Sequence, residues 1–287
     1  MSFGTVRAMA SDQAELVPTM PGVPIADTRG IVFDFGRVLS IELVGTAVLM
    51  LCGPGAAILG PNFAGKQLLV ALSFGFAYMA MIAVAGSTRL GHFNPAVTLA
   101  MLLAGKVSRK HATYAVAGQI IGGIGGVAAL WGIARGRAGF ERGGFFSNGW
   151  DRVFTDAGHV YGLGSVIVVE VLFTAILVLV VLSMSGPHVS AGLGAVVAGL
   201  TLALIHLVTM PVDNTGVNPI RSLATAIFSD VDPSALVQLW AFIVFPLIGA
   251  VIGVVVWLLL DDSRLEDTLL DTDLLRATRD VADDIVD

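Results

Sequence analysis

The chain alternates long apolar stretches with short polar connections over most of its length. A spanning helix needs about 20 apolar residues to cross a hydrocarbon core about 30 Å thick. Six stretches meet this length, at residues 38–60, 67–87, 112–134, 161–184, 191–210 and 236–260. The pattern therefore predicts an all-α membrane protein with six transmembrane helices.

Two further apolar runs are too short to span a membrane, and each begins with an Asn-Pro pair. The pairs are Asn94-Pro95 and Asn218-Pro219. Asn is favoured as a helix N-cap, and Pro is favoured at the first helical position, where an N–H would lack a partner anyway. At ~1.5 Å per residue, the run 95–104 would cross about half of the core. One such pair is also typical of a turn, but two at matching places predict two re-entrant half-helices.

The two halves of the chain place the same residue types near these pairs. Glu42 lies 52 residues before the first Asn, and Glu170 lies 48 residues before the second. Gln119 and Gln238 follow the two Asn residues by 25 and 20 positions. This spacing predicts an inverted repeat of three spans plus three. Because three is odd, the second half inserts upside down, and the two half-helices meet with their N-termini near the midplane.

Composition agrees with a membrane protein, because 55% of the residues are hydrophobic and only 13% are charged, against about 25% in soluble domains. Acidic residues concentrate in the last 27 positions, which hold three Arg and ten Asp or Glu. We therefore expect three parts. They are a polar, disordered N-terminal tail (1–37), a channel domain (38–260) and an acidic C-terminal tail (261–287). The channel domain divides into repeat one (38–134), a connecting loop (135–160) and repeat two (161–260).

An even number of spans places both termini on the same side of the membrane. Arg29 and Arg37 precede the first span, and Lys106, Arg109 and Lys110 follow the first half-helix. Positive residues favour the cytoplasmic side. We therefore expect a multi-pass protein of the cell (plasma or inner) membrane with both termini in the cytoplasm. The Arg residues of the connecting loop would then lie outside, which weakens this bias.

The expected midpoint combines two helix N-termini with two side-chain amides. The positive dipole ends repel cations, and each amide can donate a hydrogen bond to a water oxygen. Water held in this way is oriented so that neighbouring molecules do not easily pass a proton along the file. We therefore predict a pore centre formed by the two motifs, Asn94, Pro95, Ala96, Asn218, Pro219 and Ile220.

The motif segments resemble the aquaporin family, most closely its water-selective bacterial and archaeal members. The resemblance covers nearly all of residues 38–260. It rests on GHFNPAVTLA (91–100) and NTGVNPIRSLATAIF (214–228), with secondary matches in LTLALIHL (200–207), SFGFA (73–77) and FFSNG (145–149).

The resemblance implies a homotetramer with a pore in each subunit and a selectivity filter at the outer side. The matching filter positions are Phe74, His206, Thr215 and Arg221. In glycerol-conducting relatives the His and Thr usually change and an Asp follows the Arg. Here Ser222 follows Arg221, which favours water.

Arg221 is also a functional candidate from its position alone. It falls in the first turn of the second half-helix, where a cation opposes the helix dipole by ~0.3–1 kcal/mol. The matching position of the first half is Val97, so the charge belongs to one side of the pore. The alternative is an Arg that snorkels or pairs with Asp213.

Glu42 and Glu170 are costly at mid-span and need protonation or hydrogen bonds. One interpretation makes them a proton-coupling pair in a transporter. The other makes them loop-supporting groups that accept hydrogen bonds from N–H groups of the two Asn-Pro loops. Their symmetric placement favours loop support, and the resemblance implies the same.

Two features leave alternatives open. Ile220 stands where the family commonly has Ala, and it either narrows the midpoint of the pore or packs against the partner loop. His92 and His188 are candidates for a pH gate at the cytoplasmic mouth, although ordinary loop histidines are the simpler interpretation.

The predicted function is a passive water channel that selects water over ions, protons and larger solutes, with water and the lipid bilayer as its partners. The first alternative is a facilitator of glycerol or other small neutral solutes. The more remote alternative is a proton-coupled secondary transporter. We recognise no nucleophile–base pair, metal-ligand cluster or phosphate loop, and therefore expect no enzyme, no cofactor and no nucleic-acid partner.

Overall fold

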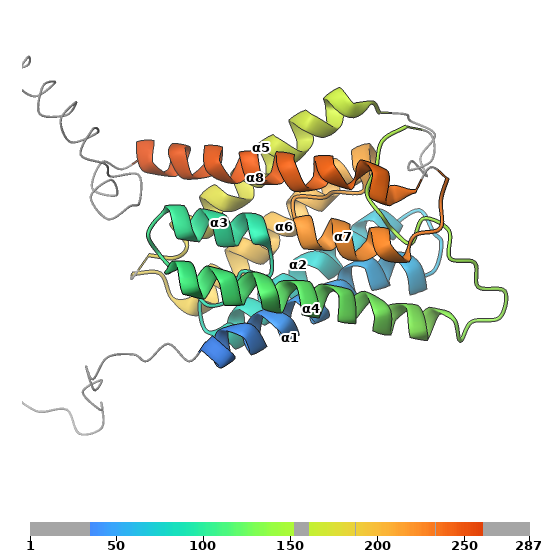
Figure 1. Cartoon of the computed structure of the whole chain (residues 1–287), viewed down its shortest axis with the longest axis horizontal. Helices are drawn as coiled ribbons and strands as arrows, with labels where there is room; N and C mark the ends of the chain where they lie inside the picture. Colours follow the sequence, from blue (N-terminus) through green and yellow to red (C-terminus); the bar gives the residue numbers. More distant parts are fainter. Residues whose placement is uncertain (1–34, 152–160, 187, 233, 261–287) are drawn as a thin grey trace, which may run out of the picture. The chain divides into compact units, whose positions relative to one another are not determined.

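The computed structural model describes residues 35–151, 161–186, 188–232 and 234–260 of the 287-residue chain (Figure 1). Within these ranges, six helices are apolar and long enough to cross a membrane. They are α1 (Phe35–Leu59), α2 (Lys66–Ala85), α4 (Arg109–Ala134), α5 (Leu163–Ser183), α6 (Ala191–Asp213) and α8 (Ala235–Leu259). The predicted all-α class with six spans is confirmed, and each predicted boundary lies within three residues of the observed one.

The two remaining helices are the predicted half-helices, α3 (Pro95–Leu103) and α7 (Pro219–Phe228). Each has an Asn at its N-cap with extended backbone dihedrals, followed by Pro at the first helical position. Figure 1 shows α3 and α7 end to end between α4 and α8, and the two half-helices are in contact. Their N-termini face each other, as the inverted repeat requires.

Helix packing follows the same plan in both halves. In each half the first and last spans form a close pair, α1 with α4 and α5 with α8, while α2 and α6 join the halves. A Cβ at Gly122 would lie 2.1 Å from the carbonyl oxygen of Leu43, and one at Gly249 would lie 2.4 Å from that of Val171. Leu43 and Val171 directly follow Glu42 and Glu170, so both helix pairs use one register. Glycine permits this close approach.

The shared register shows that the match between Gln119 and Gln238, made from sequence spacing, is wrong. Gln119 lies three residues before Gly122, and the residue three before Gly249 is Pro246 rather than Gln238. Gln238 instead exchanges hydrogen bonds with the backbone of Trp150, whose N–H donates to its Oε1 at 2.9 Å. Counting along the sequence failed because the stretch between the capping Asn and the packing glycine is longer in the second half.

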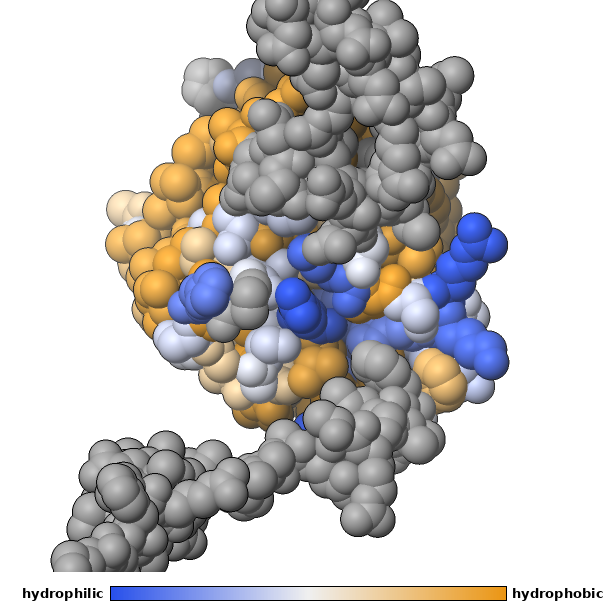
Figure 2. All heavy atoms as spheres, turned by 90° about the vertical axis from the view of Figure 1, so that its left-hand side faces the viewer, coloured by the Kyte–Doolittle hydropathy of each residue, from blue (hydrophilic) through white to orange (hydrophobic). Residues whose placement is uncertain are grey.

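The outer surface of the spans is apolar, as a lipid-facing surface should be. Exposed side chains include Val84 (73% exposed), Val237 (66%) and Val168 (60%). Figure 2 shows hydrophilic side chains gathered on one end of the molecule, with apolar side chains along its flanks. The start of α1 and the end of α8 lie at this same end (Figure 1). The predicted tails lie outside the described residues, apart from residues 35–37, which belong to α1. Both tail boundaries therefore remain predictions.

Candidate pore and selectivity site

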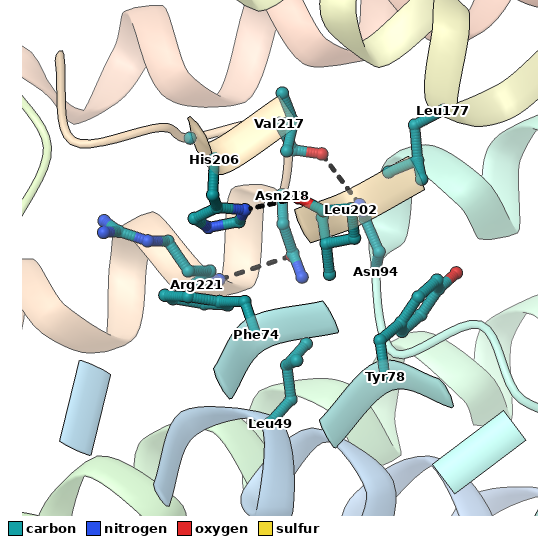
Figure 3. A pocket seen from close by; sticks show the side chains of 11 residues that line it. Leu49, Phe74, Tyr78, Asn94, Leu177, Leu202, His206, Val217, Asn218 and Arg221 are labelled. Carbon is teal, nitrogen blue, oxygen red and sulfur yellow. Dashed lines mark hydrogen bonds between the residues drawn. The ribbon is translucent and has the colours of Figure 1, made fainter. Parts of the chain in front are cut away.

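Each capping Asn binds both its own helix and the opposite loop. Asn94 Oδ1 accepts a hydrogen bond from the N–H of Ala96 at 2.9 Å, and its Nδ2 donates to the carbonyl oxygen of Val217 at 2.7 Å (Figure 3). Asn218 repeats this pattern, with Nδ2 2.9 Å from the carbonyl oxygen of Phe93. A side-chain amide has two N–H donors. One from each Asn ties the two loops together, and the second is left for the cavity that both residues line.

The residue before each Asn has a left-handed backbone that its glutamate holds in place. Phe93 has φ of 53° and Val217 has φ of 48°, in a region that bulky and β-branched residues rarely occupy. Their N–H groups donate to Glu42 Oε2 and Glu170 Oε2, both at 2.7 Å. The other oxygen of each carboxyl group accepts from the preceding N–H of the same loop. Both glutamates are fully buried, so their oxygens face the loops and not water.

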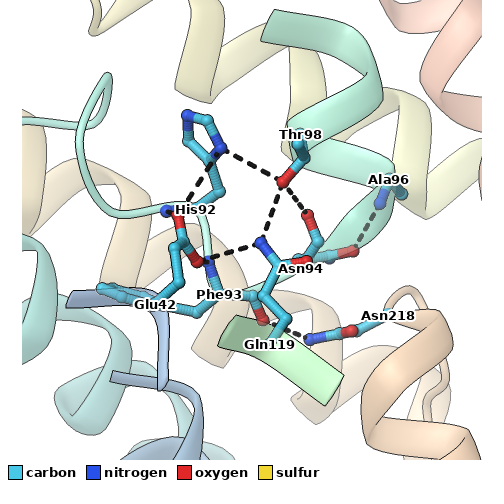
Figure 4. Close-up of polar contacts among 8 residues, drawn as sticks. All are labelled: Glu42, His92, Phe93, Asn94, Ala96, Thr98, Gln119 and Asn218. Carbon is cyan, nitrogen blue, oxygen red and sulfur yellow. Dashed lines mark hydrogen bonds and ion pairs between the residues drawn. The ribbon is translucent and has the colours of Figure 1, made fainter. Parts of the chain in front are cut away.

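A buried polar network surrounds Glu42 in the first half (Figure 4). Gln119 Nε2 donates to Glu42 Oε2 at 2.9 Å and to Thr98 Oγ1 at 2.8 Å. His92 Nδ1 lies 3.1 Å from the same Thr98 hydroxyl. His92 therefore belongs to the support of the loop and is not among the residues that line the cavity, while His188 is exposed. Their role as a pH gate stays a prediction.

A cavity runs past the paired Asn residues between the two halves (Figure 3). Phe74, His206 and Arg221 lie at one end, the two Asn residues lie in the middle, and Tyr78 lies toward the other end. The full lining is Leu49, Phe74, Tyr78, Asn94, Leu177, Leu202, His206, Gly216, Val217, Asn218 and Arg221. Among the predicted pore-centre residues, the two Asn residues line this cavity. Pro95, Ala96, Pro219 and Ile220 are not part of its lining.

Three of the four predicted filter residues come together at one end of the cavity. The rings of Phe74 and His206 stack with centroids 3.9 Å apart, and Arg221 Cζ lies 5.9 Å from the Phe74 ring centroid. Thr215 is buried but does not line the cavity, and its hydroxyl lies 2.8 Å from that of Thr209. The following residue, Gly216, takes the lining position.

The hydrogen bond of His206 identifies which ring nitrogen faces the cavity. Nδ1 lies 2.9 Å from the carbonyl oxygen of Leu202, which can only accept, so Nδ1 carries the proton. Nε2 has no partner within the described residues. In the neutral ring, Nε2 is therefore an acceptor, whereas Arg221 contributes only donors.

Arg221 is held by the connecting loop, which the sequence analysis did not assign to the site. Its Nη1 donates to Asn148 Oδ1, and its Nη2 donates to the carbonyl oxygen of Asn214 at 2.8 Å. The ring of Phe146 lies 4.7 Å from Arg221 Cζ, within the range of a cation–π interaction. The side chain is 1% exposed, so it does not snorkel to the surface. The only signal for these loop residues was the FFSNG segment.

Ile220 packs against a spanning helix, which neither sequence-based interpretation included. A Cβ added to Gly123 of α4 would lie 2.4 Å from Ile220 Cγ2. The missing side chain of Gly123 thus makes room for Ile220, which is 5% exposed. This contact is with α4.

Six spans, two opposed half-helices and a cavity into which both capping Asn residues project define a membrane channel. Residues 32–257 match the family model described as "Major intrinsic protein". The chain therefore belongs to the major intrinsic protein family, the family of the aquaporins.

Similar proteins include two that are both named Aquaporin Z. One, from Brucella melitensis biotype 1, is 39% identical over 222 residues, which cover 76% of this chain and 95% of that protein. The other, from Photorhabdus laumondii, is 38% identical over 226 residues, covering 76% and 94%. Among solved structures, the aquaglyceroporin from Plasmodium falciparum matches with a TM-score of 0.64 at 20% identity, covering 78% of this chain and 95% of that one. At that identity, the likeness supports the fold alone.

Proposed function

We propose that the protein is a passive water channel that excludes ions, protons and larger solutes. The observation that carries this proposal is the placement of a few polar side chains in a mostly apolar cavity. Two Asn amides lie at its middle, and a buried group of Phe74, His206 and Arg221 lies at one end. The similarity to two proteins named Aquaporin Z supports the same function.

The paired amides suit water because each keeps a free donor. A water at the midpoint accepts hydrogen bonds from Asn94 and Asn218 and directs its own hydrogens away from both. Neighbouring waters on the two sides are then oriented in opposite directions, which interrupts proton transfer along the file. The N-terminal dipole ends of α3 and α7 add a positive potential that disfavours cations at the same place.

The end of the cavity at Arg221 combines steric and electrostatic selection. The stacked rings of Phe74 and His206 occupy one side of it, and the guanidinium occupies another. A passing water can accept from Arg221 and donate to His206 Nε2, so it exchanges its hydration for hydrogen bonds of both kinds. A protonated water meets the fixed charge of Arg221 in a narrow, buried site, where few water molecules screen the repulsion between the two charges.

The two alternatives receive less support. Glu42 and Glu170 use both oxygens for loop N–H groups, which disfavours a proton-coupling role. The structural likeness to an aquaglyceroporin concerns the fold, whereas His206 and Ser222 favour water over glycerol. We further propose a homotetramer in the cell membrane with both termini in the cytoplasm, in keeping with the resemblance and with the positive residues near the first half-helix.

The test is osmotic shrinkage of proteoliposomes measured by light scattering. With sorbitol outside, vesicles with the protein should shrink faster than empty vesicles. With glycerol outside, they should shrink at the same rate and re-swell no faster than empty vesicles. Fast re-swelling would favour the glycerol facilitator, and a water flux that depends on an imposed pH gradient would favour a transporter.

A further inference from the structure

The lining of the middle of the cavity is close to two-fold symmetric. Leu49 and Leu177 both line it, and each lies seven residues after the supporting glutamate of its half. Asn94 and Asn218 form a second matched pair. In both pairs, the inverted repeat supplies the same residue type to the two sides of the pore.

Tyr78 and Leu202 form the third matched pair and break this symmetry. A Cβ at Gly75 of α2 would lie 2.6 Å from the carbonyl oxygen of Gly199 in α6, and one at Gly199 would lie 2.6 Å from that of Gly75. The two glycines therefore occupy equivalent places where α2 and α6 cross. Tyr78 and Leu202 each follow their glycine by three residues, and both line the cavity. One half contributes a phenol where the other contributes an aliphatic side chain.

The hydroxyl of Tyr78 has no hydrogen-bond partner among the described residues. The side chain is 2% exposed, and its hydroxyl oxygen is buried. A buried Tyr hydroxyl normally finds a partner, so an unpaired one on a cavity-lining residue points to a molecule that occupies the cavity. Edge-to-face packing on Phe93, with centroids 6.1 Å apart, orients the ring, and Figure 3 shows it on the Asn94 side of the cavity.

We propose that Tyr78 is a specificity-determining residue of the pore, whose hydroxyl binds a passing water and whose ring narrows the passage beyond the paired Asn residues. This inference rests on the proposed function. A hydroxyl both donates and accepts, while Leu202, at the equivalent position of the other half, does neither. A water that moves on must break this bond, and Leu202 offers no replacement, so the hydroxyl slows water. The ring leaves less room for a larger solute than a second Leu would.

The hydroxyl is tested by Tyr78→Phe, which keeps the ring. Loss of one hydrogen bond should raise the water permeability per channel by about two- to tenfold in matched proteoliposomes. Glycerol exclusion should stay at the parental level because the ring is unchanged. Tyr114→Phe is the control, because Tyr114 lies on α4, is 40% exposed and does not line the cavity. It should match the parent. A Tyr78→Phe channel with parental or lower water permeability would overturn the proposal.

The ring is tested by Tyr78→Leu, which makes the third pair symmetric. This variant should admit glycerol measurably faster than the parent and Tyr78→Phe do. If it folds and excludes glycerol as well as the parent does, the ring does not limit the passage and that part of the proposal is wrong. Should Tyr78→Leu fail to fold, Tyr78→Phe alone decides. A parent no faster than empty vesicles refutes the proposed function itself, whereas a conducting parent matched by Tyr78→Phe refutes only the inference about Tyr78.

Discussion

The two Asn-Pro loops share a backbone plan and differ in what surrounds it. Each has a capping Asn that reaches across to the other loop, and each is preceded by a residue with a left-handed backbone bound to a buried glutamate. The fourth residue after the Asn is a hydroxyl in both, yet its partners differ. Thr98 accepts from Gln119, whereas Ser222 donates to Asn148 at 2.8 Å.

This difference separates two tasks. The shared backbone plan brings two helix N-termini together beside the cavity that both Asn residues line. The different partners make one end of the passage unlike the other, because Asn148 also binds the guanidinium of Arg221. In the first half, Gln119 binds both Thr98 and Glu42. The position equivalent to Arg221 is the uncharged Val97. Under the proposed function, the symmetric features account for conduction, and the asymmetric ones account for selection.

The largest effect is expected from removing either glutamate. Glu42→Leu and Glu170→Leu should each prevent assembly of a stable channel, because two buried N–H groups lose their acceptor at about 1–3 kcal/mol each. The left-handed residue before each Asn would also lose its restraint. Thermal unfolding in detergent and size-exclusion chromatography measure the loss. If the shared plan is correct, both substitutions damage the protein to a similar degree.

The matched control is Glu→Gln at the same positions, which keeps an acceptor oxygen and should lower stability less than Leu does. A Glu42→Leu protein as stable and as conductive as the parent would show that the loop does not depend on this carboxyl group.

A smaller loss of stability is expected from Ile220→Ala. Removing the contact with Gly123 should lower the free energy of unfolding by about 2 kcal/mol. The water permeability per channel should stay at the parental level, because Ile220 does not line the cavity. Permeability in proteoliposomes matched for protein content is the measurement. An increase would mean that Ile220 narrows the midpoint, contrary to its packing.

Gly122→Ala should lower the free energy of unfolding by about 1–3 kcal/mol, because its Cβ would collide with the carbonyl oxygen of Leu43. Gly249→Ala should have a similar effect at the equivalent α5–α8 contact. Gly125→Ala is the control on the same helix, since nothing lies within 4 Å of its added Cβ. It should unfold at or above the parental temperature, because Ala is the better helix former. Equal effects at Gly122 and Gly125 would argue against the close α1–α4 approach.

The smallest effect is expected at the asymmetric end, from Phe146→Ala. Arg221 would lose an aromatic contact worth about 0.5–2 kcal/mol but keep its hydrogen bonds to Asn148 and Asn214. Water permeability should therefore stay near the parental value while glycerol exclusion weakens slightly. Phe145→Leu is the comparison, because Phe145 packs on Phe140 and Phe228 away from the guanidinium. Identical glycerol uptake in the parent and Phe146→Ala would exclude a role for this ring in selection.

Much of the fold could be predicted because its signals are local. Apolar length gave the six spans, and the two Asn-Pro pairs gave the start of each half-helix at the observed residue. The Glu42 and Glu170 contacts also followed from a local argument, since unpaired loop N–H groups at membrane depth need acceptors. The match between Gln119 and Gln238 was wrong because loop lengths differ between the halves.

The rest of the site depends on tertiary contacts that spacing does not encode. Asn148 and Phe146 reach Arg221 through a loop whose path has no periodic signal. Tyr78 lies in the middle of a span, where no sequence pattern distinguishes a pore-facing ring from a packed one. The position of Ile220 against Gly123 needed the crossing of α4 and α7.

The most direct test of the division between conduction and selection is the double variant Arg221→Val with His206→Ala. It removes the donors and the acceptor at the asymmetric end and leaves both Asn residues in place. We measure shrinkage under sorbitol, glycerol uptake and decay of an imposed pH gradient in vesicles holding equal amounts of parent or variant. The account predicts water permeability near the parental value, with clearly faster glycerol uptake or proton leak. A folded variant that conducts water and admits glycerol and protons no faster than the parent would contradict this account.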